Sequence, residues 1–419
     1  MAEIRGTVEP GFEQVREAFE ENFDSHGEVG AAFSLYVDGK AVVNLTGGVT
    51  TEGTEYNADT LQMVFSSTKG ATALCAHILA QRGLLDFDAP VAQYWPEFAA
   101  QGKGEIPVSW LLCHKSGLID TTRRLSLDDA LDWDTVVSAL AESTPVWEPG
   151  TQHGYHAVTY GWLVGEIVRR VSGMSIGEFF ATEVAGPLGL DFWIGLPEQQ
   201  HDRVSRLIPM GVPEGIDLEV ISAAAAGAGA GADVEAVAGL ESGTQELAAP
   251  ASIGLVQMLD MLLGPDNLAG KALSAPGGAF MDQEAWNTPA LWSAMIPAAN
   301  GVTNANSLAR MYAACVGEVD GVRLLSEDAM SKAIEVQTEG ADSVLMFPIP
   351  FAMGFMRGSD FSPLSGDRSF GHYGAGGSVG FADPDRKMAF GYVMNQMQFG
   401  LAGDPRTASL IKAVEASLS

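Results

Sequence analysis

The chain has 419 residues, of which 47% are hydrophobic and 18% are charged, and this balance excludes a disordered chain. Its 53 acidic and 23 basic residues give a formal net charge of −30 at pH 7. A surface this negative repels nucleic acid and anionic membranes, so we expect neither as a partner. High solubility is the simplest explanation for the charge.

Cysteine use and hydropathy predict a cytoplasmic protein. Cys75, Cys113 and Cys315 lie far apart without a CxxC pair, which argues against a disulfide framework and favours a reducing compartment. The first residues show no basic segment followed by an apolar run, so we expect no signal peptide. No run of about 18 apolar residues occurs, so we expect no transmembrane helix.

The first elements along the chain are a predicted helix and a predicted hairpin. Residues 9–24 show the spacing of an amphipathic helix. Its apolar face consists of Phe12, Val15, Phe19 and Phe23. Residues 30–37 and 41–48 are two strand-like runs on either side of Asp38-Gly39, a dipeptide typical of tight hairpin turns.

A long buried helix is predicted from near Ser66 to about Arg82, with Gly83 ending it. From there to about residue 330 the chain is mostly helical or irregular. Short strand-like runs follow at 350–357, 368–373, 378–382 and 388–394. A last helix is predicted over 405–418, with Asp404 as its N-cap and Pro405 at its first position.

Strands at both ends and helices between them predict an α+β fold. In this fold an antiparallel sheet forms from N- and C-terminal segments, and a mainly helical domain is inserted between them. We place the sheet domain at residues 1–85 and 300–419 and the helical domain at 86–299. The Ala/Gly-rich stretch 222–233 predicts a flexible loop within a longer insertion at about 205–290.

The SSTK sequence at 66–69 places Ser66 and Lys69 three residues apart, on one face of a helix. The field of a helix N-terminus favours a developing serine alkoxide, and a desolvated lysine can be neutral and accept the hydroxyl proton. Ser409 and Lys412 match the same pattern, but Ser409 falls inside the terminal helix, away from such a field. We therefore predict Ser66 as a nucleophile rather than an ordinary helix cap.

Tyr155 lies in a loop after Pro149-Gly150 and just before an apolar helix. A loop tyrosine near two cations can have a lowered pKa and pass a proton to a leaving group. Taken alone, Tyr155 could equally be a buried tyrosine of the core.

The third candidate segment is FGHYGAGGS at 370–378, where glycines at the end of a strand let backbone N–H groups approach a ligand. Those donors suit an oxyanion hole, and His372 could bind substrate.

In this order, the SxxK, tyrosine and glycine-flanked segments resemble the serine β-lactamase and penicillin-binding-protein superfamily. More narrowly, the chain resembles the family VIII carboxylesterases, which share the class C β-lactamase fold. The segment 110–118 (WLLCHKSGL) is similar to the LLxHxSGL segment of that family. The residues 297–310, from PAANG to LAR, are similar to its PAxG…LAR segment.

The resemblance implies an antiparallel sheet flanked by helices and a serine hydrolase that acts through an acyl-enzyme. Ser66 would attack, and Lys69 and Tyr155 would share the base and acid roles. The backbone N–H groups of Ser66 and Ala375 would form the oxyanion hole. His372 and Gly374 complete the residues that we expect to bind substrate.

Two departures from the lactam-cleaving relatives favour an ester substrate. Those relatives carry Tyr-x-Asn where this chain has Tyr155-His156-Ala157, and Lys-Thr-Gly where this chain has His372-Tyr373-Gly374. The chain thus lacks an amide that orients the substrate and a cation that binds its carboxylate. We predict a carboxylesterase of small neutral esters with short acyl chains. An acyltransferase of the same fold, a β-lactamase or D-amino-acid amidase, and a catalytically inactive binding protein are the alternatives.

Two further motifs are decoys. The sequence GGSVG at 376–380 matches the GxSxG elbow of α/β-hydrolases, but Ser378 begins a strand-like run and no histidine follows it. His153 and His156 form HxxH without further metal-ligand spacing, and we expect His114 only to order its loop. No phosphate-binding glycine loop occurs. We therefore expect neither a metal nor a cofactor, and the oligomeric state stays open.

Overall fold

The computed structural model of the protein describes residues 2–209, 264, 267–398 and 400–418. The predicted flexible stretch 222–233 and most of the predicted insertion at 205–290 lie outside the described residues. Where the structure describes the chain, no helix is long and apolar enough to cross a membrane.

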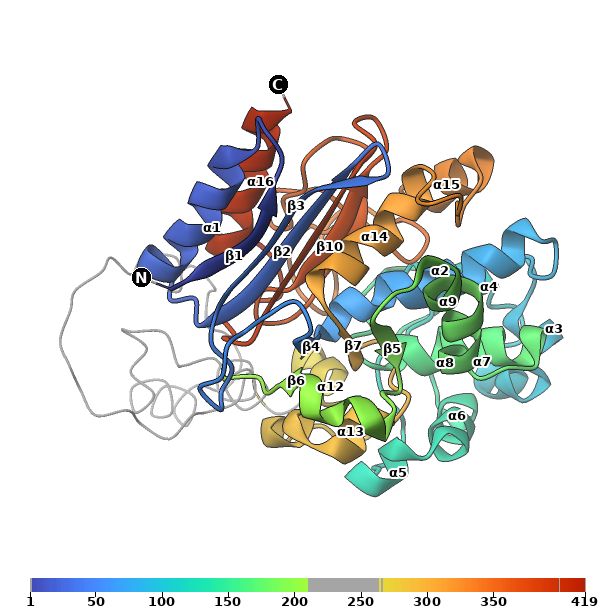
Figure 1. The fold of residues 1–419 in the computed structure, drawn as a ribbon. Helices are drawn as coiled ribbons and strands as arrows, with labels where there is room; N and C mark the ends of the chain where they lie inside the picture. The colour runs from blue at the N-terminus through green and yellow to red at the C-terminus, as the bar shows by residue number, and fades with distance from the viewer. Residues whose placement is uncertain (1, 210–263, 265–266, 399, 419) are drawn as a thin grey trace.

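The largest element is a seven-stranded antiparallel sheet in the order β1-β3-β2-β11-β10-β9-β8 (Figure 1). Its strands are β1 (Ile4–Val8), β2 (Gly30–Val37), β3 (Lys40–Gly48), β8 (Met356–Arg357), β9 (Phe370–Tyr373), β10 (Val379–Asp383) and β11 (Met388–Met394). The central pair joins β2 to β11, so the N- and C-terminal segments form one sheet, which confirms the predicted fold class. Asp38 and Gly39 take positive φ angles of 46° and 75°, as a tight hairpin turn requires.

The run at 350–357 was predicted as a strand, and most of this prediction is wrong. Only Met356 and Arg357 enter the sheet, while Phe351 forms isolated bridges to Thr338 and Met356. Pro348 and Pro350 have no N–H to donate, so this segment cannot form a regular ladder.

Helices cover both faces of the large sheet (Figure 1). The first and last helices, α1 (Glu13–Ser25) and α16 (Pro405–Ser417), lie side by side, and α14 (Ala305–Val316) packs on β2, β10 and β11. Val15 and Phe19 of α1 are fully buried, as its periodicity predicts. Asp404 caps α16 and Pro405 begins it, which confirms both expectations.

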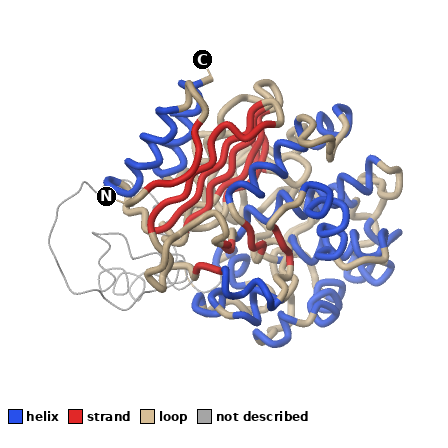
Figure 2. Tube along the Cα trace, viewed as in Figure 1, coloured by secondary structure: helices blue, strands red, loops and turns tan. Residues whose placement is uncertain are grey.

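The remaining helices gather beside the sheet (Figure 2). They are α2 (Thr68–Gln81), α3 (Val91–Tyr94), α4 (Val108–Leu112), α5 (Leu127–Leu131), α6 (Trp133–Glu142), α7 (Thr159–Ser172), α8 (Ile176–Phe180), α9 (Gly186–Leu188), α12 (Leu268–Ser274), α13 (Pro289–Ser293) and α15 (Glu327–Ala333). Helix α2 is buried on every side from Thr68 to Leu79. It packs against α7 and α8 and also contacts β9 of the large sheet.

A small four-stranded sheet in the order β5-β7-β4-β6 lies in this part of the molecule and was not predicted. Its strands are β4 (Leu61–Met63), β5 (Phe192–Ile194), β6 (Val204–Ser205) and β7 (Gly301–Thr303). Strand β7 pairs with both β4 and β5. Strands β4 and β7 belong to the predicted sheet domain and β5 to the predicted helical domain, so this sheet crosses the predicted boundaries at 85 and 300. The proposed division into two domains stays a prediction.

Candidate active site

Ser66 lies in the short connection between β4 and α2. Residues 65–67 form one 3₁₀ turn, and the α-helix itself begins at Thr68, two residues later than the sequence placed it. Phe65 has a φ angle of 41°, a strained conformation for an aromatic residue. The turn leaves Ser66 partly exposed while its neighbours Ser67 and Thr68 are buried. Ser66 is thus a partly exposed serine just before a buried helix, one residue ahead of the N-cap Ser67 rather than inside the first turn where the sequence placed it.

Lys69 is fully buried one turn beyond Ser66. Its Nζ lies 2.9 Å from Ser66 Oγ, 2.6 Å from the carbonyl oxygen of Ala157 and 3.0 Å from that of Ala298. Burial lowers the pKa of the amine well below its usual value. A neutral amine has two N–H bonds and one lone pair. Because the two carbonyls take the N–H bonds, the lone pair is left to accept the hydroxyl proton of Ser66.

Tyr155 lies beside this pair, with the Lys69 Nζ 4.7 Å from the centre of its ring. The ring stacks on Phe351 at 5.9 Å and on His372 at 6.0 Å, and its hydroxyl is hydrogen-bonded to Ser66. Burial raises the pKa of the phenol, so the lowered pKa expected from the sequence is wrong. Burial also disfavours the charged form of the nearby Lys69, which weakens the cationic field on which that expectation depended. Tyr155 is therefore a neutral hydroxyl that can relay a proton.

The backbone of Tyr155 is held by a residue that the sequence did not single out. Asp342 Oδ1 accepts the N–H of Tyr155 at 3.0 Å and those of Val344 and Leu345 at 2.8 Å each. No local motif marks Asp342, because the two residues lie 187 positions apart. Only a tertiary contact could have revealed its role.

The third predicted segment, 370–378, begins with β9 and brings His372 against the ring of Tyr155. The Nδ1 of His372 bonds the carbonyl oxygen of Tyr373 at 2.6 Å, and its Nε2 is buried with no partner among the described residues. Burial lowers the pKa of His372 to about 3, so the ring is neutral. With Nδ1 as the donor, Nε2 is a free hydrogen-bond acceptor.

The next residues form a tight turn at the mouth of the site. The amide of Gly374 donates to the Ser378 carbonyl at 2.7 Å, and that of Gly376 donates to the Gly400 carbonyl at 3.3 Å. The amides of Ser66 and Ala375 donate to no acceptor among the described residues. These two N–H groups belong to partly exposed residues that line one pocket, as an oxyanion hole requires.

The pocket in front of Ser66 has a cavity of about 90 Å³. Its wall consists of Phe65, Ser66, Tyr155, Ala157, Val158, Leu207, Pro209, Leu273, Phe280, Trp286, Asn287, Ala299, Ala375, Met397 and Leu401. None of these side chains carries a formal charge at neutral pH. The amide of Asn287 is already bonded at both ends to the backbone of Leu207. The described wall thus suits an uncharged, mainly apolar group.

Ser378 and His156, from the two decoy motifs, have structural hydrogen bonds. Ser378 is fully buried and donates to the Val64 carbonyl at 2.9 Å, so its hydroxyl is used inside the fold. His156 bonds Ser116 at 2.8 Å and the Gly154 carbonyl at 2.7 Å. The backbone N–H of His156 also donates to His114 Nδ1 at 3.2 Å, which fits the expected role of His114 in its loop. Among the described residues no group of three or more histidines, cysteines and acidic residues could hold a metal ion.

Comparison with known proteins identifies the family and the fold. Residues 15–413 match the Beta-lactamase family. The chain is 33% identical over 399 residues to "Esterase/beta-lactamase LipL" of Mycobacterium tuberculosis, a match that covers 94% of this chain and 83% of that protein. A crystal structure of a family VIII carboxylesterase is similar at a TM-score of 0.81 and 32% identity, over 99% of this chain and 100% of the other. A penicillin-binding-protein homologue from Caulobacter crescentus is similar at 0.80 and 34%, over the same shares.

The chain therefore belongs to the Beta-lactamase family, and the predicted resemblance to this superfamily is confirmed. It is a hydrolase with the fold shared by carboxylesterases and β-lactamases.

Proposed function

We propose that this member of the Beta-lactamase family is a carboxylesterase that cleaves small neutral esters through an acyl-enzyme on Ser66. The observation that carries the proposal is the placement of Lys69, a buried amine of lowered pKa 2.9 Å from Ser66 Oγ. Both other acceptors around Nζ are backbone carbonyls rather than carboxylates. A neutral base beside a serine hydroxyl is the activated pair that nucleophilic catalysis needs.

In the proposed acylation step, Ser66 Oγ attacks the ester carbonyl while its proton moves to Lys69 Nζ. The negative charge that develops on the carbonyl oxygen is bound by the N–H groups of Ser66 and Ala375. The carbon–oxygen bond to the alcohol then breaks, and the leaving oxygen takes a proton through the Tyr155 hydroxyl. Tyr155 is replenished from Lys69, which returns to the neutral amine.

Deacylation repeats these roles with water as the nucleophile. The water gives its proton to the Lys69–Tyr155 pair, attacks the acyl carbonyl and releases the acid, after which Ser66 regains its proton. His372 Nε2 is a buried acceptor near Tyr155 and does not line the described pocket. We assign it to orienting a donor of the bound substrate or of this water, which would have to reach it past Tyr155.

The pocket supports a neutral substrate. Ala157 stands on its wall at the place where the lactam-cleaving relatives carry an asparagine, and the neutral His372 stands where they carry a lysine. A hydrogen bond to a charged group contributes about 1.5–3 kcal/mol, so the loss of such a cation disfavours anionic substrates by roughly 10- to 150-fold. The cavity of about 90 Å³ beside Ser66 can take a short acyl chain.

β-Lactamase activity is the second candidate, because a relative at 33% identity is called an esterase/β-lactamase. The ratio of kcat/KM for a neutral nitrophenyl ester to that for benzylpenicillin separates the two functions. We expect a ratio far above one at several salt concentrations, with the largest kcat/KM among nitrophenyl esters for acetyl or butyryl chains. A ratio near or below one would replace the esterase by a lactamase. Ser66→Ala is the control that assigns either activity to this site.

A further inference from the structure

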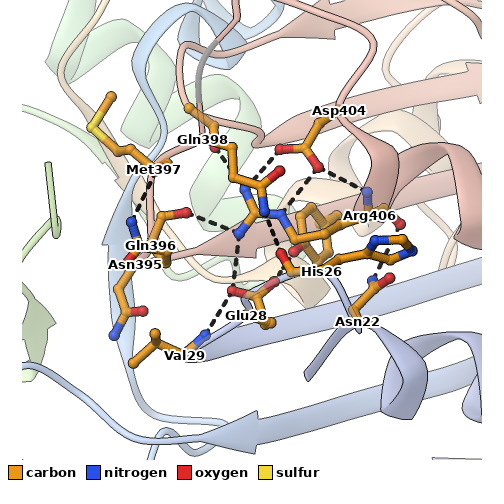
Figure 3. A network of polar contacts seen from close by, with 12 residues as sticks. Asn22, His26, Glu28, Val29, Asn395, Gln396, Met397, Gln398, Asp404 and Arg406 are labelled. Atoms are coloured by element: carbon orange, nitrogen blue, oxygen red, sulfur yellow. Dashed lines mark hydrogen bonds and ion pairs between the residues drawn. The ribbon is translucent and has the colours of Figure 1, made fainter. Parts of the chain in front are cut away.

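A buried arginine lies directly behind the turn that carries the proposed oxyanion amide. Arg406, in the first turn of α16, is fully buried between the carboxylates of Glu28 and Asp404 (Figure 3). Nothing in the sequence marks Arg406 as functional, and it does not line the pocket.

All five N–H bonds of the guanidinium have partners. Three go to carboxylates: Nε and Nη2 donate to Asp404 at 3.0 and 2.7 Å, and Nη1 donates to Glu28 at 3.1 Å. The other two go to backbone carbonyls, from Nη2 to Gly376 at 2.8 Å and from Nη1 to Gln396 at 2.9 Å. The planar fork thus fixes two loops relative to each other, which the single ammonium of a lysine could not do.

These two carbonyls belong to neighbours of pocket residues. Gly376 follows Ala375, whose N–H is the proposed oxyanion donor, and Gln396 precedes Met397 on the pocket wall. The same two loops are also joined by the N–H of Gln398, which donates to the Gly376 carbonyl at 3.0 Å. A shift of the guanidinium would therefore first move the Gly376–Gly377 peptide, which is two peptide units from the one that carries the Ala375 N–H.

Gly376 and Gly377 of this turn leave space for the buried side chains behind the turn rather than for a ligand. A Cβ on Gly377 would lie 2.6 Å from Arg406 Nη2 and would also collide with Asp404, while one on Gly376 would lie 2.7 Å from Met397 Cγ. Both glycines have positive φ angles, 85° at Gly376 and 128° at Gly377. From the sequence we expected the glycines of 370–378 to let the backbone approach a ligand. At these two positions the close neighbours are Asp404, Arg406 and Met397.

A buried ion network is weak evidence for stability, because well-packed apolar residues often replace one without loss. This network is completely bonded and ends on the turn that binds the oxyanion. We propose that Arg406 is a positioning residue that holds the N–H of Ala375 in the geometry of the oxyanion hole. This inference rests on the proposed function, since it concerns the stabilisation of charge at Ser66.

The test compares Arg406→Lys with Arg357→Lys. Arg357 is a matched control because it is also buried and also holds backbone carbonyls, at Ile334, Asp367 and Ser369, away from the pocket. For each folded variant we would measure kcat and KM for a nitrophenyl ester, and the rate at which a phosphonate inhibitor labels Ser66 by mass spectrometry. A phosphonate adduct is tetrahedral, so its formation depends on the oxyanion donors.

We expect Arg406→Lys to lower kcat and the labelling rate in parallel by about tenfold or more, with KM within about twofold of wild type. Arg357→Lys should leave all three values within about twofold. If Arg406→Lys does not fold, Asp404→Asn takes its place, with the same parallel loss expected at about threefold or more.

Two outcomes would overturn the inference, and they are distinguishable. Labelling of Ser66 in the wild type, with no larger loss of kcat in the Arg406 or Asp404 variant than in Arg357→Lys, would refute the positioning role and leave the proposed function standing. An adduct on another serine in the wild type would refute the proposed function and the inference together.

Discussion

Two regions of this chain carry the same Ser-x-x-Lys pattern and differ in almost everything else. At 66–69 the serine lies in a turn before a buried helix, and the lysine is fully buried against it. At 409–412 both residues lie inside α16, where Ser409 Oγ lies 2.9 Å from both Asn22 Oδ1 and the Arg406 carbonyl oxygen, within hydrogen-bond distance of each. Lys412 points to solvent.

The difference shows what makes a serine and a lysine into a candidate catalytic pair. Sequence spacing brings the serine and the lysine together in both regions, but only Lys69 is buried. Burial disfavours its charged form and so favours a lone pair for the serine. The hydroxyl must also be free of structural bonds. Ser66 meets this condition, whereas the hydroxyl of Ser409 is held by the first and last helices.

The sharpest contrast between the two regions is expected from the serines themselves. Ser66→Ala should lower kcat/KM for a neutral ester by about four orders of magnitude or more, because it removes the nucleophile. Ser409→Ala, the matched control, should keep most of the activity. Equal losses in the two variants would show that the pattern at 66–69 has no catalytic role.

The lysines should differ almost as strongly. Lys69→Arg should cost about 10²–10⁴ in kcat, nearly as much as Lys69→Ala, because arginine keeps its charge and cannot act as the base. Lys412→Arg, on the exposed face of α16, should change kcat by less than about twofold. Substantial activity in Lys69→Arg would mean that the positive charge, and not the lone pair, is what the site uses.

The tyrosines extend the comparison to the proton relay. Tyr155→Phe should lower kcat by about 10²–10⁴, the usual contribution of general acid–base catalysis. Tyr160 is a matched control, because its hydroxyl is also buried but has no hydrogen-bond partner among the described residues. Tyr160→Phe should stay within a few-fold of wild type. The opposite order of the two losses would assign the relay to Tyr160.

The smallest effect is expected near Ser409 and should change stability rather than rate. Burial raises the pKa of Glu28 from 4.5 to about 7, against the opposing effect of Arg406. Between these pH values the folded state binds more protons than the unfolded state, so the free energy of unfolding should fall as the pH rises from about 4.5 to about 7. The free energy of unfolding should fall by an amount on the order of 2 kcal/mol over this range.

Glu28→Gln should remove this slope, which urea unfolding at pH 5, 6 and 7 would measure. The reference is the wild-type protein at the same three pH values. A slope that persists unchanged in Glu28→Gln would assign the pH dependence to other groups.

The sequence predicted the parts of the fold that depend on local patterns. The Asp38-Gly39 hairpin, the amphipathic face of α1 and the capped start of α16 each follow from a few adjacent residues. The small four-stranded sheet was missed because its strands have only two or three residues, too few to show a period. The run at 350–357 was mistaken for a strand because its apolar composition is typical of one, although Pro348 and Pro350 already show in the sequence that donors are missing.

The candidate site was predictable where a motif carries its own chemistry, as with Ser66 and Lys69. The pKa of Tyr155 was not, because it depends on burial and on the charge state of a neighbour from another segment. Asp342 and Arg406 act through contacts with residues 187 and 30 positions away, and neither stands in a recognisable pattern. Such supporting residues become visible only once the chain is folded.

The most direct test of the central claim is the position of a covalent adduct. The whole protein would be treated with a nitrophenyl phosphonate, digested and sequenced by mass spectrometry. The account predicts a single modified serine, Ser66, and no adduct in Ser66→Ala. An adduct on Ser378 or Ser409 in the wild-type protein would contradict it.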